Sequence, residues 1–298
     1  MTTVLCAGLV TTDVVHRVRK VPARNEKLFD EGQAIEVGGP AANAARTVAA
    51  LGLDVRLVAA YGASPLTAFL AGALADEGVT WIDPLDDSPN PTPLSSVLID
   101  IDSGDRAVIA GGPREQTYPI AAEGWLVGID AVLLDGHGGD LPARVAHAAR
   151  ARGIPVVLDG GSYKATMDDY LDAIDLALLS ADFTAPQGDP VAWALGAGAL
   201  VAGRSAGAGA IDLDGPAGSV RVPVAPVAVV DTLGAGDVLH GACAAAMAVL
   251  GRAPGDIARA VTFGSTVATA SVRYAGALGW ARDADTRAAL ARDLAELR

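Results

Sequence analysis

The sequence predicts an α/β fold in which a doubly wound, mostly parallel sheet carries helices on both faces. Apolar strand-like runs alternate with helical segments through the second half of the chain, as βαβ units require. Two polar stretches with strand-like alternation, about 11–37 and 94–111, interrupt this pattern and predict a small β-sheet lid. The 298 residues contain no internal repeat or linker-like segment, so we predict a single domain over 1–298.

Charge and composition narrow the classes of partner. The net charge of −13 argues against nucleic acid or an anionic membrane as the main partner. No segment reaches the roughly 18 consecutive apolar residues of a membrane span, and the N-terminus lacks a basic leader. We therefore expect a cytoplasmic protein whose two cysteines, Cys6 and Cys243, are buried free thiols.

The first strand is predicted over 4–10, and Asp13 follows it closely. A carboxylate just beyond a strand end lies where open α/β sheets bind ligands. The alternative is an aspartate that caps a turn or a helix. The alternating segment 29–37 is predicted to add strands of the lid.

Gly38, Gly39 and Asn43 open the next segment, a helix predicted over 44–51. Paired glycines allow close backbone approach to a ligand, and Asn43 can both donate and accept hydrogen bonds. An ordinary helix start with Pro40 in the first turn is the alternative interpretation.

The remaining elements before residue 200 follow from periodicity and from glycine or proline breaks. Asp135 and Asp159 each follow a predicted strand and either line a site or cap a turn; His137 either touches substrate or is a polar loop residue. The predicted strands are 54–61, 79–82, a hairpin of 94–102 and 106–109, 131–134, 155–158, 176–179 and 199–201. The predicted helices are 67–77, 142–152, 170–174 and 190–195, with a loop over 83–93.

Residues 231–237, Asp-Thr-Leu-Gly-Ala-Gly-Asp, form the most informative stretch. They follow a strand-like run over 222–230 and precede an alanine-rich helix predicted over 241–250. Helices over 253–274 and 284–297, around a loop at 276–279, end the chain. Glycines at a helix start present backbone N–H groups to an anion. A carboxylate there would repel a phosphate unless it accepts a proton from a group that attacks the phosphate, so the stretch predicts phosphoryl transfer.

Several other site types are missing from the sequence. It contains no Gly-x4-Gly-Lys-Ser/Thr loop, no Gly-x-Gly-x-x-Gly after the first strand and no Gly-x-Ser-x-Gly elbow. Histidines and cysteines lack metal-ligand spacing. The segment 203–209 could instead cover nucleotide phosphates, with Arg204 and Gly207 as contacts; a solvated turn arginine is the alternative.

Gly38-Gly39-x3-Asn43 and the 231–237 stretch together resemble the ribokinase-like (PfkB) carbohydrate kinases over essentially the whole chain. Residues 8–13, 180–182 and 231–237 look most like the ketohexokinase branch. The resemblance implies a Rossmann-like core, a β lid, and ATP-dependent phosphorylation of a sugar hydroxyl. It implies Asp237 as general base.

The resemblance also assigns the other site residues. Gly234, Ala235 and Gly236 would form the anion hole and contact the nucleotide, while Asp13, Gly38, Gly39 and Asn43 would hold the sugar. Many members bind a monovalent cation such as K⁺ through positions matching Asp231 and Leu233. The family's Asn-x-x-Glu, which organises Mg²⁺ through water, is replaced here by residues 180–183, where Asp182 is the substitute.

Two alternative functions remain open. A nucleoside kinase of the same superfamily would favour an aromatic lid pocket, and the early lid strands have only Phe29. A sugar- or nucleotide-binding regulator without turnover would fit the altered magnesium and nucleotide segments. An exposed lid sheet often pairs with another, so we also consider a homodimer through the lid.

Overall fold

A computed structural model describes residues 1–298 except 86–92, 104–105 and 112–121. The larger of two sheets has nine strands in the order β13-β12-β11-β10-β9-β8-β1-β4-β5. Its strands are β1 (Thr3–Ala7), β4 (Asp54–Val58), β5 (Val79–Ile82), β8 (Ala131–Leu134), β9 (Val156–Gly160), β10 (Leu176–Leu179), β11 (Val201–Ala206), β12 (Gly209–Asp214) and β13 (Val220–Val222).

The seven strands from β5 to β11 pair in parallel, and β12 and β13 add an antiparallel edge. The chain runs from β1 to β4 and β5 and then returns to place β8 on the other side of β1. The order therefore reverses between β1 and β8. The predicted doubly wound, mostly parallel α/β fold is confirmed.

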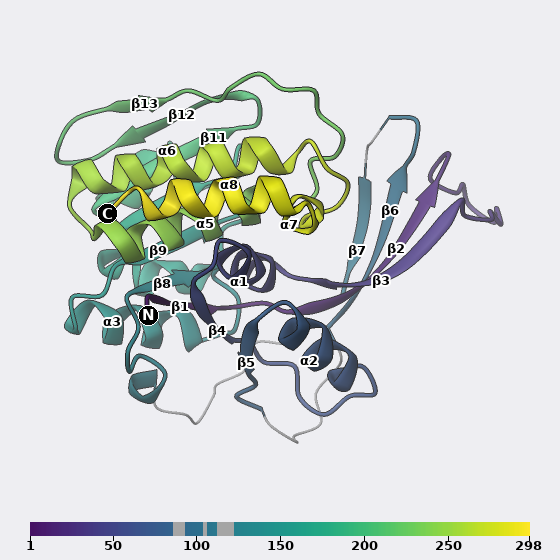
Figure 1. The fold of residues 1–298 in the computed structure, drawn as a ribbon, viewed down its shortest axis with the longest axis horizontal. Coiled ribbons are helices and arrows are strands. Elements are labelled where there is room, and N and C mark those ends of the chain that lie inside the picture. Colours follow the sequence, from purple (N-terminus) through teal and green to yellow (C-terminus); the bar gives the residue numbers. More distant parts are fainter. Residues whose placement is uncertain (86–92, 104–105, 112–121) are drawn as a thin grey trace.

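Helices cover both faces of this sheet (Figure 1). One face carries α1 (Pro40–Ala50), α2 (Thr67–Asp76), α5 (Ala235–Leu250), α6 (Pro254–Ser271) and α8 (Ala284–Ala295), with α7 (Gly279–Arg282) beside α8. The opposite face carries α3 (Leu141–Ala151), α4 (Pro190–Gly196) and short 3-10 turns at Ala165–Asp169 and Leu171–Ala173. These turns replace the helix predicted over 170–174. A further 3-10 turn spans Ala122–Gly124.

The strands are apolar on both sides because helices lie on both sides. On β1, Val4 and Cys6 join the core beneath α1 and α5, whereas Leu5 and Ala7 join the core beneath α3. All four are fully buried. Cys6 and Cys243 are free and buried, as predicted.

The sequence interpretation was wrong at the β11 edge. The strand predicted over 199–201 begins at Val201 and extends to Ala206, and the strands β12 and β13 were not predicted. Residues 223–229, expected to be strand, pair with no strand in the described structure. Pro223 and Pro226 cannot donate backbone hydrogen bonds, and most of this run is exposed.

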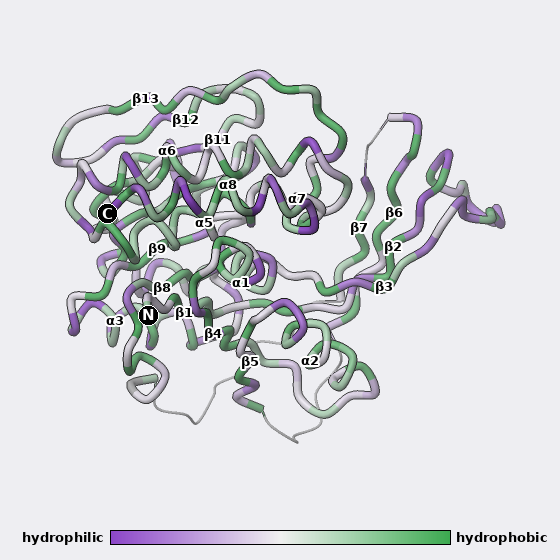
Figure 2. Tube along the Cα trace, viewed as in Figure 1, coloured by the Kyte–Doolittle hydropathy of each residue, from purple (hydrophilic) through white to green (hydrophobic). Residues whose placement is uncertain are grey.

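The smaller sheet has the order β3-β2-β6-β7 and projects from the body beside α2 (Figure 1). Its strands are β2 (Thr11–Val18), β3 (Gly32–Gly38), β6 (Leu94–Asp100) and β7 (Arg106–Ala110). Apolar residues predominate in β6 and β7, whereas β2 and β3 mix apolar and polar residues (Figure 2). The inward Val15, Val97 and Ile99 are buried against Leu233, whereas the outward Ile35 and Ile109 are 56% and 73% exposed.

Part of the predicted 83–93 loop and of the 103–105 turn lies outside the described residues. Within the described residues, no helix is both long and apolar enough to cross a lipid bilayer.

Candidate active site

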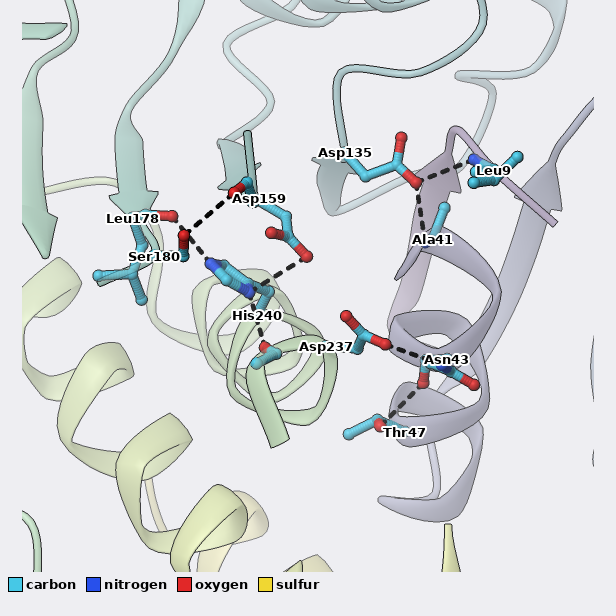
Figure 3. Close-up of polar contacts among 12 residues, drawn as sticks. Leu9, Ala41, Asn43, Thr47, Asp135, Asp159, Leu178, Ser180, Asp237 and His240 are labelled. Atoms are coloured by element: carbon cyan, nitrogen blue, oxygen red, sulfur yellow. Dashed lines mark hydrogen bonds and ion pairs between the residues drawn. The ribbon is translucent and has the colours of Figure 1, made fainter. Parts of the chain in front are cut away.

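Several of the predicted site residues lie at the carboxyl ends of the central strands, beside the point where strand order reverses. This is where open α/β sheets bind ligands, because the helices on either side leave a crevice there. The loop after β1, the end of β8 and the end of β9 meet the first turns of α1 and α5 (Figure 3).

The start of α5 is shaped to accept an anion. Gly234 caps the helix with φ 71°, and a Cβ there would lie 2.4 Å from the Ala277 side chain. The N–H groups of Gly236 and Asp237 have no hydrogen-bond acceptor in the described part of the chain. Free N–H groups and the positive end of the helix dipole attract negative charge. Gly236 and Asp237 therefore offer a cradle of two free N–H groups, whereas the Ala235 N–H donates to the Thr232 carbonyl.

Asp237 lies in the first turn of α5, next to these N–H groups. Its Oδ2 accepts a hydrogen bond of 2.8 Å from Asn43 Nδ2 on α1 (Figure 3). Burial and the neighbouring carboxylate of Asp159 raise the pKa of Asp237 to about 7, against the lowering effects of Asn43 and His240. A carboxylate with a pKa near neutrality can take up a proton and release it again.

Asn43 is itself held by Arg46, a residue that the sequence interpretation missed. Arg46 donates to Asn43 Oδ1 at 3.1 Å and to the Val37 carbonyl at 3.1 Å. The Arg46 guanidinium also pairs with Glu77, with Nη2 to Oε1 at 2.7 Å. Arg46 is only 8% exposed. The i to i+3 spacing on one helix could have suggested the Asn43–Arg46 contact.

Asp13 lies in strand β2, so neither the turn nor the helix cap considered above is correct. Its Oδ1 accepts a 2.7 Å hydrogen bond from Thr11 Oγ1, and burial raises its pKa. Gly38 pairs with Thr11 on the neighbouring strand, and a Cβ on Gly38 would lie 2.0 Å from the Asp13 carboxylate. Gly39, at φ 97°, leaves no room for a Cβ against the Leu9 carbonyl. The missing side chain at Gly38 thus leaves space for the Asp13 carboxylate, and that at Gly39 leaves space for the backbone after β1.

Asp135 connects the backbone segments that line this crevice by hydrogen bonds. Its carboxylate accepts hydrogen bonds from the N–H groups of Leu9 at 2.9 Å, Ala41 at 3.0 Å and His137 at 2.9 Å. Burial acts to raise its pKa, but the neighbouring His137 and the N–H donors lower it below the usual value. His137 also approaches it, with Nδ1 3.2 Å from Oδ1. Asp135 therefore fixes the end of β1 against the start of α1.

Asp159 and His240 form a second buried group, next to Asp237 (Figure 3). Asp159 Oδ2 lies 3.2 Å from His240 Nδ1, and burial raises the pKa of Asp159. The sequence interpretation noted His240 only as lacking metal-ligand spacing. Its position three residues after Asp237 was the available signal, because that spacing places both on one side of a helix.

Asp231 joins the loop before α5 to the loop at 276–279. Its Oδ1 accepts from Leu233 N at 2.9 Å and its Oδ2 from Gly276 N at 2.8 Å. Asp231 and Leu233, the two positions expected around a monovalent cation, thus lie together beside Gly276.

The expected nucleotide residues lie at the ends of β10 and β11. Asp182 is exposed in the turn after β10. Arg204 is a strand residue, not a loop residue, and its guanidinium donates to the carbonyl of Ala181, next to Asp182. Gly207 makes the β11–β12 turn with φ 57°. Among the described side chains, no three His, Cys, Asp or Glu residues are grouped as metal ligands.

The pfkB family carbohydrate kinases match residues 1–282 of this chain. The chain belongs to this family. It is a phosphotransferase, an ATP-dependent sugar or nucleoside kinase, so the predicted family and enzyme class are confirmed.

Individual relatives align with nearly the whole chain. An ATP-dependent ribose-1-phosphate kinase from Halopiger xanaduensis is 28% identical over 303 residues, covering 99% of each chain. Ribokinase from Arabidopsis thaliana, solved with ribose and ATP, is 21% identical, with a TM-score of 0.74 over 98% of each chain. Phosphofructokinase-2 from Escherichia coli, solved with potassium, is 19% identical, with a TM-score of 0.76 over 99% of each chain. These two structures share the fold of this chain.

Proposed function

We propose that this kinase transfers the γ-phosphate of ATP to a hydroxyl of a sugar or sugar-like acceptor, with Asp237 as the general base. One observation carries the proposal: Asp237 has a raised pKa and lies beside two free backbone N–H groups at the start of α5. A base and an anion site in one helical turn can serve the attacking hydroxyl and the transferred phosphoryl group together.

In this mechanism Asp237 accepts the proton of the acceptor hydroxyl as its oxygen attacks the γ-phosphorus. Asn43 orients the carboxylate by its hydrogen bond to Oδ2. The cradle of Gly234, Ala235 and Gly236 stabilises the negative charge on the transferring group. Phosphoryl transfer passes through a loose transition state, so positioning and charge stabilisation supply most of the rate. Each well-placed donor contributes about 3 kcal/mol.

Asp13, Gly38, Gly39 and Asn43 hold the acceptor in this proposal. Asp13 reaches the crevice from the lid sheet, and its carboxylate can accept hydrogen bonds from sugar hydroxyls. Because the Halopiger relative acts on ribose 1-phosphate, we include phosphorylated ribose among the candidate acceptors. The ketohexokinase branch, which motifs 8–13 and 180–182 favour, remains a prediction.

For ATP, we propose contacts from Arg204 and Gly207 on the β11–β12 edge, with Gly234 and Gly236 at the phosphates. Magnesium would neutralise phosphate charge during transfer, and Asp182, an exposed carboxylate beside the Arg204 contact, would hold it through water. Asp231 and Leu233, joined to the 276–279 loop, would hold a monovalent cation such as K⁺ and stabilise the loop before α5.

We further propose that residues 1–298 form one kinase domain, with the second sheet as its lid, and that lids of two copies pair. The outward row Ile35, Val14, Ser96 and Ile109 crosses all four lid strands. Its two edge isoleucines are more than half exposed. Three of the four residues are apolar, and an exposed apolar patch on a sheet is typical of a protein contact.

Asp237→Asn tests the proposal. The substitution keeps size and polarity but removes the base, so kcat should fall by about 10² to 10⁴ with little change in KM. ADP release is measured with a panel of sugars, sugar phosphates and nucleosides. Asp256→Asn is the matched control, because Asp256 occupies the same third position of a helix, α6, away from the site.

Asp237→Asn activity within tenfold of the wild type would contradict the assignment of the base. A nucleoside as the best acceptor would replace the sugar in the proposal. Binding of sugar and ATP without ADP release would favour the regulator.

A further inference from the structure

His240 is a buried histidine whose two ring nitrogens both face backbone carbonyls. It is 3% exposed. Nδ1 lies 2.6 Å from the Gly236 carbonyl, one turn earlier on α5, and Nε2 lies 2.9 Å from the Leu178 carbonyl on β10 (Figure 3). The ring therefore ties the first turn of α5 to the central sheet.

Counting donors indicates the charge of this ring. A neutral imidazole has one N–H, whereas two carbonyl oxygens can only accept. Both contacts are hydrogen bonds only if the ring is a doubly protonated imidazolium. A neutral ring would leave one nitrogen lone pair facing a carbonyl oxygen in a place without water access.

Asp159 supplies the matching negative charge. Its side chain lies at the end of β9, is 5% exposed, and has Oδ2 3.2 Å from His240 Nδ1. That oxygen has no other hydrogen-bond partner in the described residues. A buried carboxylate is costly unless a cation pairs with it. The negative charge of Asp159 and the positive charge of His240 thus stabilise each other in the buried site.

The pair lies against the proposed base. Asp237 precedes His240 by three residues on α5, and the charged groups facing this crevice come from several elements. Asp135 and Asp159 end β8 and β9, His137 and Lys164 lie on the loops after them, and Asn43 on α1 is neutral. Three carboxylates converge here, so their mutual repulsion opposes ionisation of Asp237.

We infer that Asp159 and His240 form a buried ion pair that positions the first turn of α5 and offsets the carboxylate repulsion on Asp237. The inference rests on the proposed role of Asp237. His240 holds the carbonyl of Gly236, and the N–H of the same peptide group, that of Asp237, supplies part of the anion cradle. The positive charge of the His240 ring favours the ionised form of Asp237. Both members are positioning residues, since they act through Asp237 and Gly236.

Opposite charge changes at the pair should move the pH profile of kcat/KM in opposite directions. Asp237 must be ionised to act, so its protonation sets the acidic limb. His240→Gln removes a positive charge and should move this limb up by about one pH unit. Asp159→Asn removes a negative charge and should move it down by a similar amount. The double variant should return close to the wild type.

His147→Gln is the matched control, because His147 is a helical histidine on α3 that contacts the Asp169 carbonyl at an exposed position. The acidic limb of the kcat/KM profile should not move in the His147→Gln variant. Unchanged limbs in both single variants, or shifts in the same direction, would overturn the inference. A merely structural role would lower the melting temperature without these opposed shifts.

Ring ¹⁵N NMR of the wild-type protein gives a readout that needs neither activity nor a folded variant. Both His240 nitrogens should carry protons at pH 7, and a neutral ring would overturn the inference. If Asp237→Asn keeps its activity while the His240 ring is protonated, the base assignment fails and the ion pair stands. If Asp237→Asn is inactive but the ring is neutral, only the ion pair fails.

Discussion

The two sheets contain similar apolar strand residues but bury them against different partners. In the nine-stranded sheet, strand residues such as Leu133 are buried between two layers of helices. In the lid sheet, only the inward face is covered, and its buried residues Val15, Val97 and Ile99 pack against Leu233 of the 231–237 segment. Burial in the large sheet therefore stabilises the fold, whereas burial in the lid sheet joins the proposed acceptor-binding surface to the 231–237 segment.

The largest expected effect is on the free energy of unfolding, which a core substitution in the large sheet should lower more than one in the lid sheet. Leu133→Ala should lower the free energy of unfolding by about 2–5 kcal/mol, because the fully covered site cannot collapse around the cavity. Val97→Ala in the lid removes two buried carbons instead of three and should cost about 1–2 kcal/mol. Urea unfolding measures both. Equal losses would show that the lid is as tightly packed as the core.

A substitution in the lid sheet should affect acceptor binding more than it affects stability. Asp13→Asn should raise KM for the acceptor by about 10- to 100-fold, because the charge is lost and one of the two acceptor oxygens becomes an NH2 donor. Unfolding should change little, since Asp13 is only partly buried. Asp102→Asn, on an exposed turn of the same sheet, is the control. Loss of kcat with unchanged KM would contradict the binding role.

The smallest effect on the folded chain concerns the outward lid face. Ile109→Lys changes a residue that is 73% exposed, so stability should shift by less than about 0.5 kcal/mol. If lids pair, the charge should convert the dimer to a monomer in sedimentation or light scattering. Val127→Lys, at a 67% exposed position on the main body, should leave assembly unchanged. A wild-type monomer at micromolar concentration would refute lid pairing.

Much of the architecture could be predicted because it is encoded locally. Strands β5, β8 and β10 lie within the predicted bounds, since short apolar runs ended by polar residues or glycine leave one interpretation. The β11–β12–β13 edge could not, because these strands are short, and the pairing of distant segments decides their structure. The proline-containing run before residue 231 was misread for the converse reason: its apolar residues found no partner strand.

The sequence by itself determined the alternation that makes an α/β fold, the glycine-flanked carboxylate of 231–237, and its resemblance to a kinase family. These properties depend on neighbours a few positions apart. The tertiary structure alone decided that Asn43 meets Asp237 across 194 residues, and that Leu178 and Asp159 surround His240. Hydrogen bonds and ion pairs need contact within a few ångströms, and only the order of strands in the sheet sets which distant side chains come that close.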